Sequence, residues 1–137
     1  MIFIDANIPM YLVGQPHPNK ERALLLLERV ALDKVRMVTD AEVLQEILHR
    51  YRAIGRWEDG RRVYDLVRTL VPDIIELGVD TLDCARVLMD RYPKLVARDA
   101  LHAAAVIGLG ADAWVTWDTD FDPIKEINSL RPDQAYQ

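Results

Sequence analysis

The amino-acid sequence predicts an α/β fold, an open α/β/α sandwich with a central parallel sheet of four to five strands. Short apolar runs that fit buried strands alternate with longer segments in which apolar residues recur at helical spacing. This alternation is typical of parallel strands joined by right-handed helical crossovers that cover both faces of the sheet. The 137 residues are enough for one compact domain, expected to span 1–137.

The first part of the chain predicts one strand and two helices. Residues 1–4 form a continuously apolar run ending on Asp5, the pattern of a central strand buried on both faces. Asn7 and Pro9 suit the entry to a helix, where proline costs nothing. After a loop, a second helix begins at Asn19 or Lys20. Its apolar residues at helical spacing are Ala23, Leu24, Leu27 and Val30.

The middle of the chain continues the alternation. Residues 35–39 predict a second strand. The pattern Thr39-Asp-Ala-Glu42 predicts a capping box for a helix that runs to about Ile54 and is closed by Gly55. Another helix spans roughly 58–70.

The remaining elements follow the same logic. Pro72 prevents continuation of the helix before it, and a third strand begins at Ile74. Asp80 is expected to cap a helix that ends near Tyr92. A further helix runs from about 97 to 109, is terminated by Gly110, and leads to a fourth strand at 113–116.

Composition restricts the function classes. No apolar run approaches the ~20 residues of a membrane span, and the N-terminus lacks a secretory pattern, so we expect a cytoplasmic protein without a membrane partner. The net charge of −5 argues against nucleic-acid binding by bulk electrostatics. Chemistry on a nucleic acid would therefore need bound metal ions and clustered arginines. The single Cys84 cannot form an intrachain disulfide and is expected as a buried small hydrophobe.

Acidic residues stand where a parallel sheet places its ligand site. Asp5 closes the first strand, and Asp118 lies two residues past Thr116 of the last. One such aspartate is commonly a turn former, but two from non-adjacent strands favour a site. Asp99 lies in the first turn of an alanine-rich helix, where the helix dipole favours a carboxylate by about 0.3–1 kcal/mol. The alanines would let this helix pack close to the strand ends.

Two glutamates lie one turn apart on the helix after the second strand. The capping box accounts for Glu42 alone. Periodicity places Glu46 opposite the apolar stripe of the same helix, on a solvated face, so the pattern leaves its role open. The stripe consists of Leu44, Ile47, Leu48 and Tyr51.

Carboxylates gathered in one pocket raise one another's pKa through repulsion and desolvation, and a divalent cation removes that cost. Mg²⁺ or Mn²⁺ suits an all-oxygen site. Zinc is less suited, because the lone cysteine and His17, His49 and His102 show no ligand spacing. An acidic metal site can activate water for in-line attack on a phosphodiester without a covalent nucleophile.

Four motifs, in this order, resemble those of the PIN-domain family and, within it, the toxin nucleases of VapC type. They are a hydrophobic strand followed by Asp5-Ala-Asn7, the helical Val43-Leu-Gln-Glu46, the helix start Asp99-Ala-Leu-His, and Thr116-Trp-Asp118 after the final strand. Each motif is weak by itself, but the ordered set covers nearly the whole chain. The resemblance selects Glu46 over Glu42.

The resemblance implies a PIN-like fold and an Mg²⁺- or Mn²⁺-dependent endoribonuclease. It also implies a homodimer whose cleft is occupied by a cognate antitoxin. Asp5, Glu46, Asp99 and Asp118 are then catalytic, and the three aspartates hold the metal. Asp120 or Asp122 could share the role of Asp118, because all three lie in one acidic turn.

Contacts with RNA are predicted less sharply. Arginines are in excess between residues 50 and 68, and arginine pairs well with phosphate, but a solvated helix surface with salt bridges explains the same pattern equally well. The substrate-binding candidates are Asn7, Thr116, Arg50, Arg61 and Arg62. Trp117 could stack on a base, although packing over the sheet edge is the commoner role. His102 is expected to pack between helices.

Two other functions are compatible with a short α/β chain. A signalling receiver domain would need paired acids after the first strand and a lysine after the last, whereas here Asp5 is followed by Ala6 and the last strand leads to Trp117. A PIN-like module could instead bind RNA or a partner without cutting. The filled acidic positions favour the nuclease.

Overall fold

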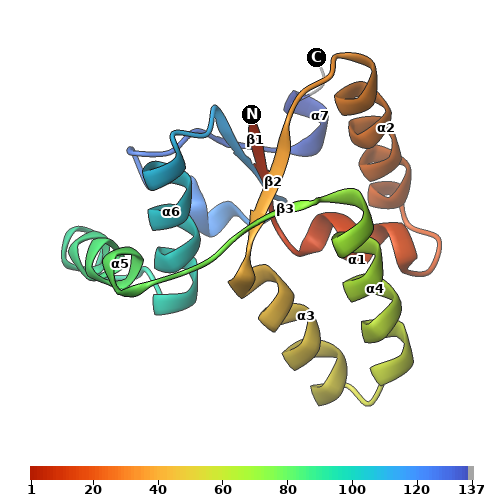
Figure 1. The fold of residues 1–137 in the computed structure, drawn as a ribbon, viewed down its shortest axis with the longest axis horizontal. Coiled ribbons are helices and arrows are strands. Elements are labelled where there is room, and N and C mark those ends of the chain that lie inside the picture. Colours follow the sequence, from red (N-terminus) through yellow and green to blue (C-terminus); the bar gives the residue numbers. More distant parts are fainter. Residues whose placement is uncertain (136–137) are drawn as a thin grey trace.

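A five-stranded parallel sheet organises the protein, whose computed structural model describes residues 1–135. The strands lie in the order β3-β2-β1-β4-β5. Their bounds are β1 Ile2–Ile4, β2 Met37–Asp40, β3 Asp73–Ile75, β4 Ala113–Val115 and β5 Ser129–Leu130. The strand order reverses at β1, which has β2 on one side and β4 on the other (Figure 1). The predicted sandwich with a parallel sheet is confirmed.

Helices cover both faces of the sheet. In Figure 1, α5 and α6 lie together on one side, and α1 to α4 lie on the other. The bounds are α1 Asn7–Val13, α2 Pro18–Leu32, α3 Ala41–Ala53, α4 Trp57–Leu70, α5 Val79–Arg91, α6 Ala97–Leu109 and α7 Pro132–Ala135, with a 3₁₀ turn η1 at Thr119–Phe121. Among the described residues no helix is both long and apolar enough to cross a membrane.

Side chains that alternate along the strands pack into two separate hydrophobic cores, one on each face of the sheet. Phe3 and Trp114 pack against α5 and α6, whereas Ile4 and Val115 pack against α1 to α4. This follows from the period of two along a strand, which turns neighbouring side chains to opposite faces. Each fully buried large apolar side chain contributes roughly 1.5–3 kcal/mol to folding. The two cores together fix the sheet, and with it the positions of the strand ends.

Two predicted helix caps are wrong. Strand β2 continues through Asp40, so the Thr39 hydroxyl donates to the carbonyl of Ile4 across the sheet (2.8 Å) instead of capping α3. Asp40 caps the helix, because its Oδ1 accepts from the backbone N–H of Val43 (2.9 Å). Helix α5 begins at Val79 after Gly78, which places Asp80 inside its first turn.

Other sequence expectations shift by small amounts. Helix α2 begins at Pro18, and its buried face uses Leu26, whereas Leu24 is 48% exposed. The short β5 brings the sheet to the upper end of the expected four to five strands. Cys84 is half-buried against the core under α5 and α6, so it is less enclosed than expected.

Candidate active site

The carboxyl ends of β1, β2 and β4 meet at one edge of the sheet, and Asp5 lies at their centre. Its side chain is 6% exposed. Its Oδ1 accepts from the backbone N–H of Ala6 (2.6 Å), and its Oδ2 accepts from the hydroxyl of Thr116 (2.7 Å). The carboxylate is therefore held rigidly at the point where the strand order reverses, which is where open parallel sheets bind ligands.

Asn7 and Thr116 act as partners of Asp5. The Asn7 amide donates to the Thr116 hydroxyl (3.1 Å) and, at 3.4 Å, to Asp5 Oδ2. The same hydroxyl accepts from the backbone N–H of Asp118 (2.9 Å). These contacts connect the residues after β1 to those after β4. Asn7 and Thr116, which were predicted to bind substrate, therefore contact the acidic residues of the site.

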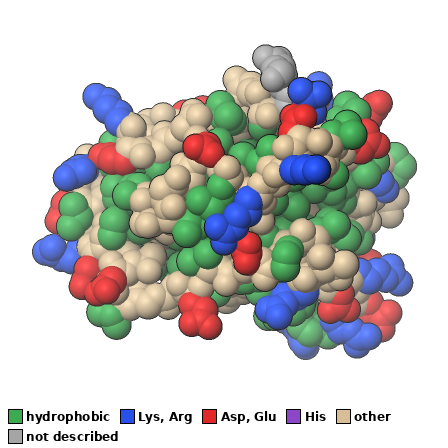
Figure 2. Space-filling view, turned by 45° about the horizontal axis from the view of Figure 1, so that its top comes forward, with side chains coloured by type: hydrophobic (Ala, Val, Ile, Leu, Met, Phe, Trp, Pro, Cys, Tyr) green, Lys and Arg blue, Asp and Glu red, His purple; other side chains and the backbone are tan. Residues whose placement is uncertain are grey.

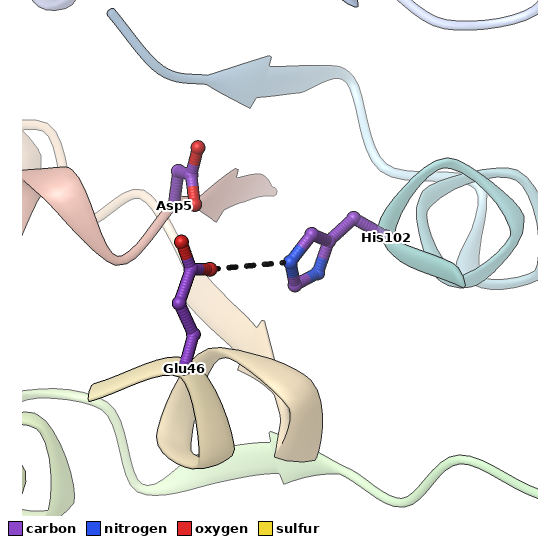
Figure 3. A group of neighbouring side chains, drawn as sticks. All are labelled: Asp5, Glu46 and His102. Atoms are coloured by element: carbon purple, nitrogen blue, oxygen red, sulfur yellow. Dashed lines mark ion pairs between the residues drawn. The ribbon is translucent and has the colours of Figure 1, made fainter. Parts of the chain in front are cut away.

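Glu46 reaches from α3 towards the same edge. Figure 3 shows its carboxylate pointing to Asp5 and to the ring of His102. Its side chain is 25% exposed, and Oε2 lies 3.8 Å from His102 Nε2. Helical periodicity had left Glu46 open as a solvated residue. The structure places it on the flank of α3 that faces the strand ends, between the buried stripe and solvent.

A buried ion pair lies beneath these carboxylates and was missed from the sequence. His102 Nδ1 is 2.7 Å from Asp40 Oδ2, and the two side chains are 1% and 0% exposed. The imidazole stacks on Trp114 with ring centroids 5.1 Å apart. Asp40 and His102 are 62 positions apart, so no local pattern joins them. Their only sequence signals were Asp40 at a strand end and His102 one turn after Asp99.

The predicted acids fall into two groups at this edge. Asp5 and Glu46 belong to one group with His102, and Asp99 and Asp118 belong to another with Asp120. Within each group, one possible ligand atom from every residue lies within 4.8 Å of the others. Asp118 Oδ1 also accepts from the backbone N–H of Asp120 (2.9 Å).

The aspartates of the acidic turn after β4 have two different sets of contacts. Asp122 is committed to Arg131, whose Nη2 donates to both of its carboxylate oxygens at 2.7 and 2.6 Å. Arg131 Nη1 also donates to the carbonyl of Thr116 (3.0 Å). Asp122 therefore braces the turn, and Asp118 and Asp120 remain beside Asp99.

Burial and charge shift the pKa values of the site in opposite directions. Burial raises the pKa of Asp5 to about 6, although His102 and Thr116 oppose the shift. Burial alone would lower the pKa of His102, but the nearby carboxylates of Asp40 and Glu46 outweigh it and raise that pKa to about 10. Burial and the neighbouring Asp118 raise the pKa of Asp99. Despite burial, His102 and two arginines lower the pKa of Glu46.

The carboxylates of both groups line two hollows that open to solvent. One, of about 470 Å³, is lined by Asp5, Glu46, Asp118 and Arg50 among others. The second, of about 450 Å³, holds Asp99 and Asp120 against an apolar wall. The arrangement presents acidic groups to a ligand from both sides of the strand ends.

The predicted arginines lie in different surroundings. Arg50 and also Arg56 line the first hollow, whereas Arg61 and Arg62 do not. Arg62 pairs with Asp59 (3.3 Å), which fits the salt-bridged surface that the sequence left open. On the face drawn in Figure 2, basic and acidic side chains are interspersed. Trp117 is half-buried and packs edge-on against Tyr11, with ring centroids 5.0 Å apart.

The donor atoms suit a hard divalent cation. Five of the six residues in the two groups offer carboxylate oxygens, the ligands preferred by Mg²⁺ and Mn²⁺. The raised pKa of Asp5 fits the same conclusion, because a buried carboxylate next to a second one is stabilised by a proton or a cation.

Known proteins resemble this chain over nearly its full length, although no protein-family model matches it. Ribonuclease VapC13 of Mycobacterium tuberculosis is 42% identical over 130 residues, covering 95% of this chain and 99% of the relative. A VapC ribonuclease of Mycobacterium bovis matches to the same extent. Ribonuclease VapC23 of M. tuberculosis is 39% identical over 121 residues, covering 86% of this chain and 93% of the relative.

Solved structures agree in fold. VapC20 of M. tuberculosis, a toxin that cleaves the sarcin–ricin loop, superposes with a TM-score of 0.73 at 17% identity, covering 91% of this chain and 95% of its own. VapBC2 of Rickettsia felis, bound to promoter DNA, gives 0.75 at 20% identity, covering 96% and 98%. Given 42% identity across almost the whole of both chains, this protein belongs to the VapC family, as its four motifs implied.

Proposed function

We propose that this chain is a metal-dependent endoribonuclease, the toxin of a type II toxin–antitoxin pair, and that residues 1–137 act as one nuclease unit. Relatives at 42% identity are named ribonucleases. The observation that carries the proposal is the meeting of two ligand groups at the strand ends, Asp5-Glu46-His102 and Asp99-Asp118-Asp120.

Mg²⁺ or Mn²⁺ is the proposed cofactor, held by Asp5 on one side and by Asp99 and Asp118 on the other. When bound, such an ion lowers the pKa of water and neutralises charge on the phosphate. Asp120 is an additional acid in the second group. We exclude Asp122 from this set because both of its oxygens accept from Arg131.

Glu46 is the proposed group that orients the attacking water and accepts its proton. Its pKa is lowered, so it is ionised at neutral pH, and it lines the hollow that a substrate would enter. Asn7 and Thr116 keep the Asp5 carboxylate in one orientation. A rigid carboxylate needs little reorganisation when charge develops at the phosphate.

RNA is the proposed substrate, and Arg50 is the preferred phosphate contact. Arg50 lines the same hollow as Asp5 and Glu46, which supports this choice over Arg61 and Arg62. The net charge of −5 means that such local cations have to supply the attraction.

A cognate antitoxin and a second copy of the chain are the proposed protein partners. Neighbours in fold include toxin–antitoxin complexes, which supports the first. Exposed apolar side chains on α2 and α5 are available for protein contacts; they are Leu24, Leu25, Leu32, Val79, Leu82, Val87 and Met89. An RNA substrate and a protein antitoxin are both consistent with a cytoplasmic location.

The test is cleavage of total bacterial RNA by purified protein, with 5′ ends mapped by sequencing. We expect cleavage with Mg²⁺ or Mn²⁺, none in excess chelator, and recovery when the ion is restored. Glu46→Gln should cut about 10²–10⁴-fold more slowly, while Glu42→Gln, one turn away on α3, should cut normally. Cleavage that persists in chelator, or equal rates for the two variants, would contradict the proposal.

A further inference from the structure

His102 is held by two contacts close to the Asp5 carboxylate. Its Nδ1 is 2.7 Å from Asp40 Oδ2, and its ring stacks on Trp114. Asp40 is itself immobilised, because its other oxygen accepts from the backbone N–H of Val43. With Nδ1 engaged, the remaining ring nitrogen, Nε2, has a set direction, and Figure 3 shows it facing Glu46.

Nε2 of His102 is buried and has no hydrogen-bond partner among the described residues. Glu46 Oε2 lies 3.8 Å away, beyond the 2.7–3.2 Å of a normal N–H···O bond. Two ligand atoms about 2.1 Å from one octahedral ion lie ~3.0 Å apart when adjacent and ~4.2 Å apart when opposite. The 3.8 Å separation lies between these two values, so only a small movement of the Glu46 side chain would let both atoms contact one ion. Asp5, Glu46 and His102 also present their ligand atoms within 4.8 Å of one another.

We propose that His102 Nε2 is a direct ligand of a divalent ion bound on the Asp5–Glu46 side of the pocket. Asp40 holds the imidazole in place, as carboxylates do for many metal-binding histidines. The inference rests on the metal site of the proposed function and adds to it a nitrogen ligand and a buried supporting carboxylate. It also makes Glu46 a ligand as well as a base.

A nitrogen ligand changes which ion the site prefers. Mg²⁺ favours oxygen ligands and keeps its waters, whereas imidazole is a common ligand of first-row transition metals. The Asp5 side should therefore select Mn²⁺ over Mg²⁺. Only an unprotonated Nε2 can bind a metal, so ion binding competes with protonation of the ring, as is usual for histidine ligands.

The test is pulsed electron paramagnetic resonance of Mn²⁺ bound to the full-length, untagged protein without RNA. We expect a nitrogen coupling whose pattern changes when the histidines carry ¹⁵N, a measurement that needs no variant. His102→Gln should lose the coupling and weaken Mn²⁺ binding about 10–100-fold. The affinity for Mg²⁺, measured by its competition with Mn²⁺, should fall less than the affinity for Mn²⁺. His17→Gln is the matched control because His17 lines the hollow that also holds Asp5 and Glu46.

Bound Mn²⁺ without histidine nitrogen coupling in the wild type would overturn the proposal. So would unchanged Mn²⁺ affinity in His102→Gln. RNA cleavage is scored separately: a protein that cuts RNA but shows no coupling refutes His102 as a ligand and leaves the nuclease proposal standing. A protein that shows the coupling but cuts no RNA supports His102 as a ligand and contradicts the nuclease proposal.

Discussion

Asp5 places an ionisable carboxyl group in buried surroundings that favour its neutral form. The side chain is 6% exposed, and burial raises its pKa from 3.8 to about 6. Because the folded-state pKa lies above the unfolded value, this residue stabilises the fold least above pH 6. A carboxylate kept at such a cost is typical of functional sites.

Replacing Asp5 with Asn should stabilise the metal-free protein at neutral pH. The shift from 3.8 to about 6 corresponds to up to about 3 kcal/mol. The gain should shrink as the pH falls through 6 towards 4, because the wild-type carboxyl becomes protonated in both states. Urea unfolding of both proteins in chelator at several pH values measures this difference in the free energy of unfolding. A variant less stable than the wild type at pH 7.5 would show that Asp5 is not a destabilising charge.

Thr116 should control the pKa of Asp5. Its hydroxyl donates to Asp5 Oδ2, which lowers that pKa. Thr116→Val keeps the shape and removes the donor, so the Asp5 pKa should rise above its present value of about 6, and the protein should lose about 1–3 kcal/mol. Carboxyl NMR titration of metal-free protein gives the pKa, and Thr69→Val on the exposed side of α4 is the control. An unmoved Asp5 titration would refute the role of the hydroxyl.

At the scale of elements, one buried pair joins pieces that are distant in the chain. Asp40 ends β2 and caps α3, while its other oxygen contacts His102 on α6. Removing one member of a buried pair costs about 3–5 kcal/mol, because the other charge is left without a partner. The geometry of the pocket therefore depends on β2, α3 and α6 together.

The crossing of α3 and α4 depends on a glycine. A Cβ at Gly60 would lie 2.6 Å from the Cβ of Tyr51, so Gly60→Ala should force the helices apart and cost about 1–3 kcal/mol. Gly108 in α6 has open space around it, and Gly108→Ala should gain about 0.5–1 kcal/mol. Thermal unfolding of the two variants compares them directly. Equal effects would mean that the two helices can separate freely.

For the whole molecule, metal binding should be visible as stability. A ligand at about 100 times its Kd stabilises the folded state by about 2.7 kcal/mol, so Mn²⁺ should raise the Tm of the wild type. Asp5→Asn should respond much less, because it lacks a central oxygen ligand. Scanning calorimetry with and without Mn²⁺ provides the measurement. The same rise in both proteins would place the ion elsewhere.

The sequence predicted features that depend on neighbouring residues. Apolar runs located β1, β2 and β4, and the ends of these runs pointed to Asp5 and Asp118. Contacts between distant segments were out of reach. The Asp40–His102 pair spans 62 positions, and the bidentate contact between Arg131 and Asp122 depends on how the acidic turn folds back. Glu46 could be placed only through family resemblance, because its helix face borders both core and solvent.

The central claim is that carboxylates at the strand ends perform metal-dependent hydrolysis of RNA. The single-turnover rate of RNA cleavage in Mn²⁺, compared for Asp5→Asn and Asp122→Asn, tests it most directly. Asp122 is also an aspartate near these strand ends, but it is paired with Arg131 outside both ligand groups. We expect Asp5→Asn to abolish cleavage while remaining folded and Asp122→Asn to retain it. Undiminished cleavage by Asp5→Asn would contradict the claim.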